Sequence, residues 1–219
     1  MNRSRTATAT LIALAVVVSA STARAFPQPG GAFIVKENLG TLPGSTYSSA
    51  NAINSSRQIT GRGDFSTAFL WTPPGPMVEL EPSQDLQWGS DINDSGQITG
   101  SATGFIFAWD AFLWTPPGPA VVLQPPPEIL FDEWPSAINN LGEVVGSWED
   151  PPTRPFFWRS PGPMIDLGTL GGTGGTSTDI NESSEVVGAA KLAGDAETHG
   201  FYWTEDGGMM DLGDAEASG

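Results

Sequence analysis

Short apolar runs alternate with glycine, proline and asparagine along this chain, and one arrangement of them returns four times at a spacing of about 43 residues. Each unit contains an Ile-Asn pair, whose asparagines are Asn54, Asn93, Asn139 and Asn181. A glycine follows each asparagine after seven residues, at Gly61, Gly100, Gly146 and Gly188. An aromatic triplet then ends in tryptophan, at Trp71, Trp114, Trp158 and Trp203. Self-similarity at this period is the signature of a repeat architecture, so we expect these asparagines and tryptophans to be structural.

Each unit predicts four short strands. In the first unit one strand ends at Ile53-Asn54, two more cover Gln58–Gly61 and Phe69–Trp71, and the last begins at Met77. β-Branched residues favour the extended backbone of such strands, and clusters of proline, glycine and asparagine mark the turns between them. We therefore place the four repeats at residues 47–80, 86–123, 134–167 and 175–213.

The third strand of each unit is apolar at consecutive positions, which indicates a sheet that is buried on both faces. Four-stranded sheets of this kind, repeated every 40–50 residues or so, are typical of propeller blades. The predicted fold class is all-β, a β-propeller-like array of four four-stranded repeats. A β-solenoid and a sandwich of meanders are the alternatives.

Closure of the ring is a separate question. The lead-in segment Asn38–Leu42 echoes Asp166–Leu170, which follows a fourth strand, and the chain ends soon after another fourth strand at Met209–Leu212. These features leave two alternatives, a closed four-blade ring with a spare strand or an open, incomplete ring. We expect the open arrangement, with self-association through its uncovered ends.

The first 25 residues have the pattern of a secretion signal. Arg3 and Arg5 precede a short apolar core at Leu11–Val18, and Ala23-Arg24-Ala25 is a small-x-small cleavage site. The apolar run is shorter than the ~20 residues that a membrane-spanning helix needs. We therefore expect a signal peptide at 1–25, a lead-in strand and linker at 26–46, a tail at 214–219, and a protein secreted to the periplasm or the exterior.

The charge excludes one class of partner. The net charge is −16, and removal of residues 1–25 takes away three arginines and no acidic residue, which leaves −19. Because nucleic-acid binding needs a basic surface, we expect no nucleic-acid partner. The chain has no cysteine, so it lacks thiol nucleophiles and disulfides. We expect no cofactor and no metal; Asp91–Ile98 has calcium-like oxygen spacing, but an Asx turn explains it better.

The motifs resemble those of the HAF-repeat family of predicted extracellular bacterial proteins. The matching segments are Asp166–Gly172, Glu185–Gly188, Ala68–Trp71, Ala111–Trp114 and Gly208–Gly213. The histidine of the family's His-Ala-Phe tripeptide is present only as His199, where Gly200 replaces the alanine. The resemblance implies export and a repeat fold, and it supplies no catalytic residues.

Some connections between strands keep the same length in all four repeats, and others vary in length. The step from the repeat glycine to the aromatic triplet is 8, 12, 10 and 13 residues, whereas the step from the asparagine to that glycine is always 7. In an up-and-down sheet, the loop between the second and third strands lies at the same end as the loop into the next sheet. Insertions confined to one side of a repeat array usually mark its binding face, so we expect ligands at this loop end.

The loop end also collects residues that the repeat itself does not require. Four further tryptophans lie in or beside the variable loops, namely Trp88, Trp109, Trp134 and Trp148. Acidic residues accompany them, among them Asp110, Asp132, Glu133, Glu149 and Asp150. Aromatic faces together with carboxylates suit a carbohydrate or a cationic ligand. The alternative is that these rings only cover the core, because large aromatic side chains bury well.

We therefore predict a non-catalytic extracellular binding module, for glycans or for another surface protein. The candidate ligand-binding residues are Trp88, Trp109, Trp134, Trp148, Asp132, Glu149 and Asp150. One alternative is a structural cell-surface or assembly protein without a specific ligand. Another is a glycosidase-like enzyme that uses a carboxyl pair among Asp132, Glu133, Glu149 and Asp150. The single histidine, His199, stands at the start of a third strand, and we expect no catalytic role for it.

Overall fold

A computed structural model describes residues 24–27, 33–36, 38–81, 85–103, 109–125, 132–149 and 151–213. The chain divides into two compact units, Met1–Asn38 and Leu39–Gly219. In the first unit β1 (Arg24–Pro27) pairs antiparallel with β2 (Phe33–Lys36). The strand β2 lies within the expected lead-in segment, residues 26–46. The sequence did not predict β1, which extends across the expected cleavage site.

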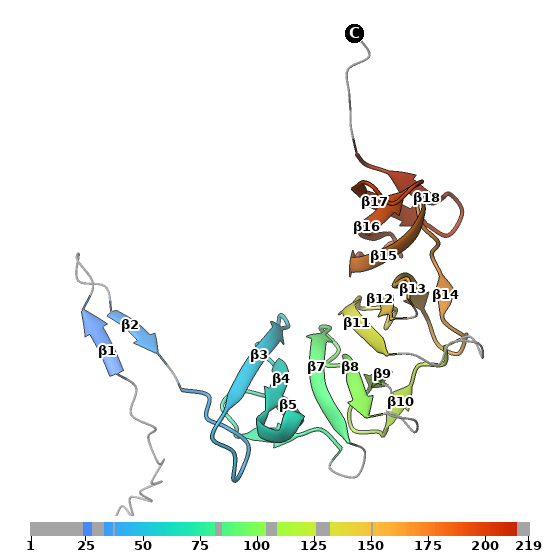
Figure 1. Cartoon of the computed structure of the whole chain (residues 1–219). Coiled ribbons are helices and arrows are strands. Elements are labelled where there is room, and N and C mark those ends of the chain that lie inside the picture. The colour runs from blue at the N-terminus through green and yellow to red at the C-terminus, as the bar shows by residue number, and fades with distance from the viewer. Residues whose placement is uncertain are drawn as a thin grey trace, which may run out of the picture. The chain divides into compact units, whose positions relative to one another are not determined.

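The second unit contains four antiparallel four-stranded sheets (Figure 1). Sheet 1 holds β3 (Ser48–Ile53), β4 (Ile59–Gly63), β5 (Ala68–Trp71) and β6 (Met77–Glu79), with a 3-10 turn, η1 (Asp64–Ser66), before β5. Sheet 2 holds β7 (Leu86–Ile92), β8 (Ile98–Thr103), β9 (Trp109–Trp114) and β10 (Ala120–Val122). Sheet 3 holds β11 (Glu133–Ile138), β12 (Val144–Trp148), β13 (Arg154–Trp158) and β14 (Ile165–Asp166). Sheet 4 holds β15 (Gly171–Ile180), β16 (Val186–Leu192), β17 (Thr198–Thr204) and β18 (Gly208–Asp211).

Each sheet is a simple meander in which consecutive strands are neighbours. The first strands of successive sheets, β3, β7, β11 and β15, lie side by side from cyan to orange in Figure 1. Among the described residues each sheet remains four-stranded, and no ring is closed by strand pairing. The predicted all-β array of four propeller-like repeats is therefore confirmed, in its open form.

The hydrophobic core is divided among the junctions between sheets. Sheet 1 residues pack with sheet 2 residues in one cluster, sheet 2 with sheet 3 in a second, and sheet 3 with sheet 4 in a third. The four triplet tryptophans are buried in these clusters or in the cluster behind sheet 1, at Trp71, Trp114, Trp158 and Trp203. Behind sheet 1, Leu39 and Leu42 of the lead-in segment cover Phe69 and Trp71.

A β-bulge recurs in the first strand of every sheet and explains the repeat glycine. The strand register shifts three residues before each repeat asparagine, around Asn51, Ser90, Ser136 and Thr178. The bulge brings the backbone of the first strand against the second. A Cβ at Gly100 would lie 2.0 Å from the carbonyl oxygen of Trp88, and one at Gly146 would lie 2.2 Å from that of Trp134. Only glycine fits at these positions.

The repeat asparagines join neighbouring sheets in a ladder at the turns between first and second strands. The Nδ2 of Asn54 donates to the carbonyl oxygen of Asn93 over 3.0 Å, and Asn93 donates to Asn139 over 2.9 Å. Asn139 donates in turn to Asn181 over 3.0 Å. Each asparagine also holds its own turn; the Oδ1 of Asn93 accepts from the amides of Ser95 and Gln97, which confirms the predicted Asx turn.

Candidate binding face

The sheets have two different ends. The asparagine ladder occupies the end with the constant turns, and the variable loops occupy the other end, where first and third strands begin. Trp88 lies near the start of β7, Trp109 is the first residue of β9, and Trp134 is the second residue of β11. The topology thus places all three tryptophans at the loop end.

Trp88, Trp109 and Trp134 meet in one group, called here the tryptophan cluster. The rings of Trp88 and Trp134 are stacked, with centroids 5.1 Å apart and planes 11° apart. Trp109 is tilted against both, with its ring centroid 5.0 Å from that of Trp88 and 6.0 Å from that of Trp134. All three side chains are partly exposed. Two adjacent sheets therefore share an aromatic surface that solvent reaches.

The cluster is held by hydrogen bonds between sheets 2 and 3. The Oδ1 of Asp132 accepts from the amide of Trp109 over 2.9 Å, which fixes the start of β9 against the start of β11. The Oγ of Ser101 in β8 donates to the carbonyl oxygen of Glu133 over 3.0 Å. Asp132 was predicted as a ligand contact; its carboxylate serves this inter-sheet bond and its side chain is partly exposed.

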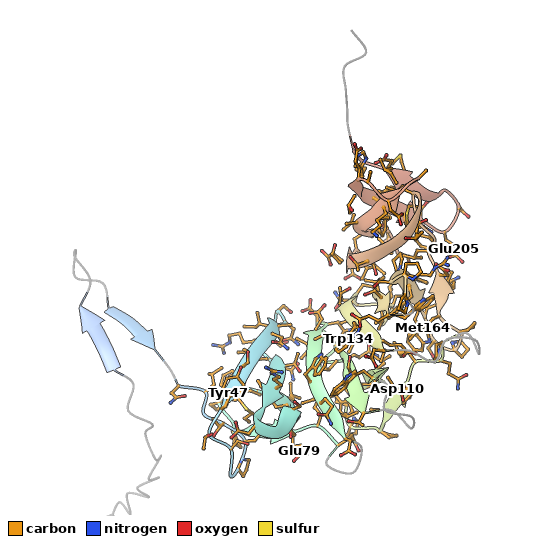
Figure 2. All side chains as sticks on the ribbon, viewed as in Figure 1. Tyr47, Glu79, Asp110, Trp134, Met164 and Glu205 are labelled. Atoms are coloured by element: carbon orange, nitrogen blue, oxygen red, sulfur yellow. The ribbon has the colours of Figure 1, made fainter. Side chains whose placement is uncertain are left out.

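Glu133 is an enclosed carboxyl group beside the cluster. Its residue is only 2% exposed, and its Oε2 accepts from the amide of Ala111 over 2.9 Å. Burial raises the pKa of Glu133 to about 8, the bond from Ala111 opposes that shift, and the nearby charge of Asp110 adds to it. Burial also raises the pKa of Asp110. Figure 2 shows Asp110 and Trp134 on neighbouring sheets.

A separate groove lies between sheets 3 and 4. It has a volume of about 590 Å³ and lies between the β12–β13 connection and strands β15–β17. Its walls include Glu149, Pro152, Gly174 and Lys191. The amide of Glu149 donates to the carbonyl oxygen of Asp132 over 2.8 Å, so Asp132 contacts both the cluster and the groove wall. The predicted Glu149 is therefore linked through its backbone to the predicted Asp132, whereas Asp150 lies outside the described residues.

Trp148 differs from the other three loop tryptophans. It ends β12, is 1% exposed, and its ring stacks on Phe156 with centroids 5.8 Å apart. Its ring has no face open to a ligand, because it packs in the junction between sheets 2 and 3. For this residue the structure matches the alternative of core packing.

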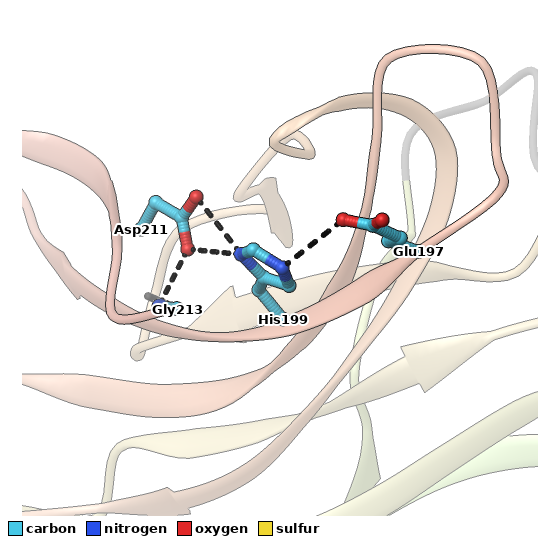
Figure 3. A network of polar contacts seen from close by, with 4 residues as sticks. All are labelled: Glu197, His199, Asp211 and Gly213. Carbon is cyan, nitrogen blue, oxygen red and sulfur yellow. Dashed lines mark hydrogen bonds and ion pairs between the residues drawn. The ribbon is translucent and has the colours of Figure 1, made fainter. Parts of the chain in front are cut away.

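His199 lies in β17 of sheet 4, a different sheet from those that carry the tryptophan cluster. Its Nδ1 lies 2.9 Å from Oδ1 of Asp211 in β18, and its Nε2 lies 3.6 Å from Oε2 of Glu197. Figure 3 shows these residues together. The amide of Gly213 also donates to Asp211, over 2.7 Å. This bond first, and then His199, lowers the pKa of Asp211. The network ties the last strand to its neighbour.

Within the described ranges, no group of three or more His, Cys, Asp or Glu side chains could hold a metal ion. The same part of the chain contains no helix that is long and apolar enough to cross a membrane. No protein-family model matches the chain, and a comparison with curated proteins finds no matching relative.

Proposed function

We propose that this chain is an exported, non-catalytic binding module that holds a carbohydrate on the tryptophan cluster. One observation carries the proposal. Three tryptophans from three strands of two sheets meet within 6.0 Å of one another at the loop end and stay partly exposed. Sugar rings have apolar C–H faces that pack on indole rings, and their hydroxyl groups donate to carboxylates.

The groove between sheets 3 and 4, whose wall residue Glu149 is hydrogen-bonded to Asp132, gives a sugar chain room to continue. Ligand sites usually enclose about 300–1,000 Å³, and this groove encloses about 590 Å³. Glu149 and the backbone around Gly174 offer acceptors along it. An oligosaccharide would thus place one unit on the tryptophans and further units toward β15.

The charge narrows the class of sugar. Asp110 and Asp132 lie around the cluster, Glu149 lines the groove, and the groove's Lys191 is paired with Asp195 at 3.8 Å, in a chain whose net charge is −16. Like charges repel at close range. We therefore propose neutral or amino sugars as ligands, rather than uronic-acid or sulfated glycans.

The resemblance to the HAF-repeat family and the signal-like first 25 residues support export. A structural surface protein without a ligand would have no need for exposed tryptophans at the variable end. A glycosidase would need a carboxyl group that reaches the substrate, whereas Glu133, whose pKa burial raises to about 8, is enclosed. We therefore favour binding over hydrolysis.

The test is a calorimetric titration of the purified protein with three oligosaccharides: neutral cello-oligosaccharides, amino-sugar chitosan oligomers and anionic alginate oligomers. We expect one of the first two to bind and the third not to bind. Trp88→Ala and Trp109→Ala should each weaken binding at least ~10-fold, since a ring stacked on a ligand contributes on the order of 1–3 kcal/mol. Trp88→Tyr should keep part of the affinity.

Leu141→Ala is the matched control, because Leu141 is an exposed apolar residue at the opposite, constant-turn end. It should leave binding unchanged. Unchanged affinity in folded Trp88→Ala and Trp109→Ala proteins, or binding by none of the three oligosaccharides, would contradict the proposal.

A further inference from the structure

The first and last sheets of the array each expose a face that the internal sheets bury. The forward face of a sheet is the one that packs on the next sheet along the chain, and the rear face is the one that packs on the preceding sheet. Between successive sheets, the second strand of the earlier sheet buries one residue against the next sheet. Those residues, Thr60, Thr99 and Val145, are each 0% exposed. The equivalent residue of sheet 4, Val187, is 39% exposed. Sheet 4 therefore has a forward face that no described residue covers.

The rear face of sheet 1 shows the complementary difference. The isoleucine before each repeat asparagine is buried against the preceding sheet, with exposures of 5%, 7% and 8% at Ile92, Ile138 and Ile180. The equivalent Ile53 of sheet 1 is 62% exposed. Leu39 and Leu42 already cover Phe69 and Trp71, and they take the place that Leu80, Leu123 and Leu167 take at the other junctions. The uncovered part of sheet 1 is the surface around Ile53, which the strands of a preceding sheet would contact.

Among the described residues, the asparagine ladder also ends with an unused donor at sheet 4 and an unused acceptor position at sheet 1. Asn181 holds its own turn, but in the described part of the chain no following asparagine carbonyl accepts from its Nδ2. Asn54 lies at the other end, where its carbonyl oxygen accepts from the amide of Arg57 in its own turn and, among the described residues, from no side chain of a preceding sheet. A donor thus stands at the sheet 4 end and an acceptor at the sheet 1 end.

Asp179 repeats this pattern at the sheet 4 end. The two carboxylate oxygens of its equivalent, Asp91, accept from the amides of Ile92 in its own strand and Ile138 in the next sheet. Asp179 accepts from Ile180 in its own strand. A shallow groove of about 200 Å³ runs along this face, lined by Asp179, Ile180, Asn181, Glu185, Val187 and Tyr202.

We propose that the forward face of sheet 4 binds the rear face of sheet 1 of a second copy of this chain. The chain builds this junction three times within itself, and its two end sheets carry the unmatched halves. Val187 and Tyr202 would pack on Ile53 of the second copy, and Asn181 would donate to the carbonyl oxygen of its Asn54. The sheet 1 turn carries Arg57 and the sheet 4 turn carries Glu182 and Glu185, so opposite charges favour the encounter.

This contact is heterologous, because each copy uses a different face. Heterologous contacts continue from copy to copy until they close a ring or extend a filament. The inference is independent of the proposed glycan site, which lies at the loop end rather than on these two faces.

The test uses sedimentation velocity on the purified protein and on two variants, Val187→Lys and Ile53→Lys. We expect the wild-type protein to associate with rising concentration and each variant alone to be monomeric. An equimolar mixture of the two should form dimers, because one variant keeps an intact sheet 1 face and the other an intact sheet 4 face. That rescue distinguishes a head-to-tail contact from a symmetric one.

Met210→Lys is the matched control. Met210 is also exposed on sheet 4, but its equivalents Val78, Val121 and Ile165 stay exposed at every internal junction, so this variant should associate like the wild-type protein. Circular dichroism confirms that each variant is folded. A wild-type protein that stays monomeric at all concentrations, or a mixture of folded variants that does not dimerise, would overturn the proposal.

Discussion

The side-chain amide of Asn93 donates to the main-chain carbonyl oxygen of Asn139, 2.9 Å away in the next sheet. Equivalent bonds link Asn54 to Asn93 and Asn139 to Asn181. The residue that defines the repeat in the sequence is therefore also the residue that joins one repeat to the next. In a linear array, stability depends on such nearest-neighbour interfaces.

Asn93→Ala should cost more stability than Asn181→Ala. Both asparagines hold their own turns, but only Asn93 also donates to a following sheet, and it is buried. A hydrogen bond to a buried acceptor contributes about 1–2 kcal/mol, and we expect that difference between the two variants. Chemical denaturation of both proteins measures it. Equal losses would show that the ladder does not stabilise the junctions.

The two sets of repeat glycines should differ in tolerance. A Cβ at Gly100 would lie 2.0 Å from a backbone oxygen, whereas one at Gly118 would have its nearest neighbour at 3.4 Å. We expect Gly100→Ala to destabilise the fold by more than about 3 kcal/mol, because backbone must move, and Gly118→Ala to stay within about 1 kcal/mol. Thermal unfolding of the pair tests this, and similar melting temperatures would contradict the bulge explanation.

The glycines equivalent to Gly100 show how much of the fold the sequence predicts. Their seven-residue spacing from the asparagines predicted the repeat and its strands, because periodicity is visible without coordinates. Their physical cause was not visible. A β-bulge leaves no regular mark in the hydrophobic pattern, so the close approach of Trp88 to Gly100 emerges only from the strand register.

The loop tryptophans show the same limit. Trp88 and Trp134 each stand five residues before a repeat asparagine, and the structure stacks their rings. Trp148 belonged to the same list of candidates, yet it is buried against Phe156. Position in a loop did not predict which tryptophan is exposed and which is buried. Burial depends on how each ring packs against the neighbouring sheet, and the sequence does not show this packing.

Glu133 should make stability depend on pH. Its pKa is about 8 in the folded protein, above its ordinary value of 4.5. The folded state therefore holds this proton more tightly than the unfolded chain does. The resulting stabilisation is complete below about pH 4.5 and is lost as the pH rises toward 8, by up to roughly 1.4 kcal/mol for each pH unit.

Glu133→Gln should remove this contribution, because the amide stays neutral and its oxygen can still accept from Ala111. Denaturation of the two proteins at several pH values between 4 and 9 measures the difference. We expect the variant to be the more stable protein near pH 8 and to have the flatter profile. Parallel profiles would show that Glu133 is not a buried neutral acid.

The central claim is that the tryptophan cluster contacts a carbohydrate, and indole N–H resonances test it most directly. The chain has eight tryptophans, whose side-chain signals can be assigned by single substitutions in a nitrogen-15-labelled protein. On titration with the oligosaccharide that binds, we predict that the signals of Trp88, Trp109 and Trp134 shift together while those of Trp71, Trp114, Trp158 and Trp203 stay in place. Saturating ligand that leaves the three cluster signals unmoved would contradict the account.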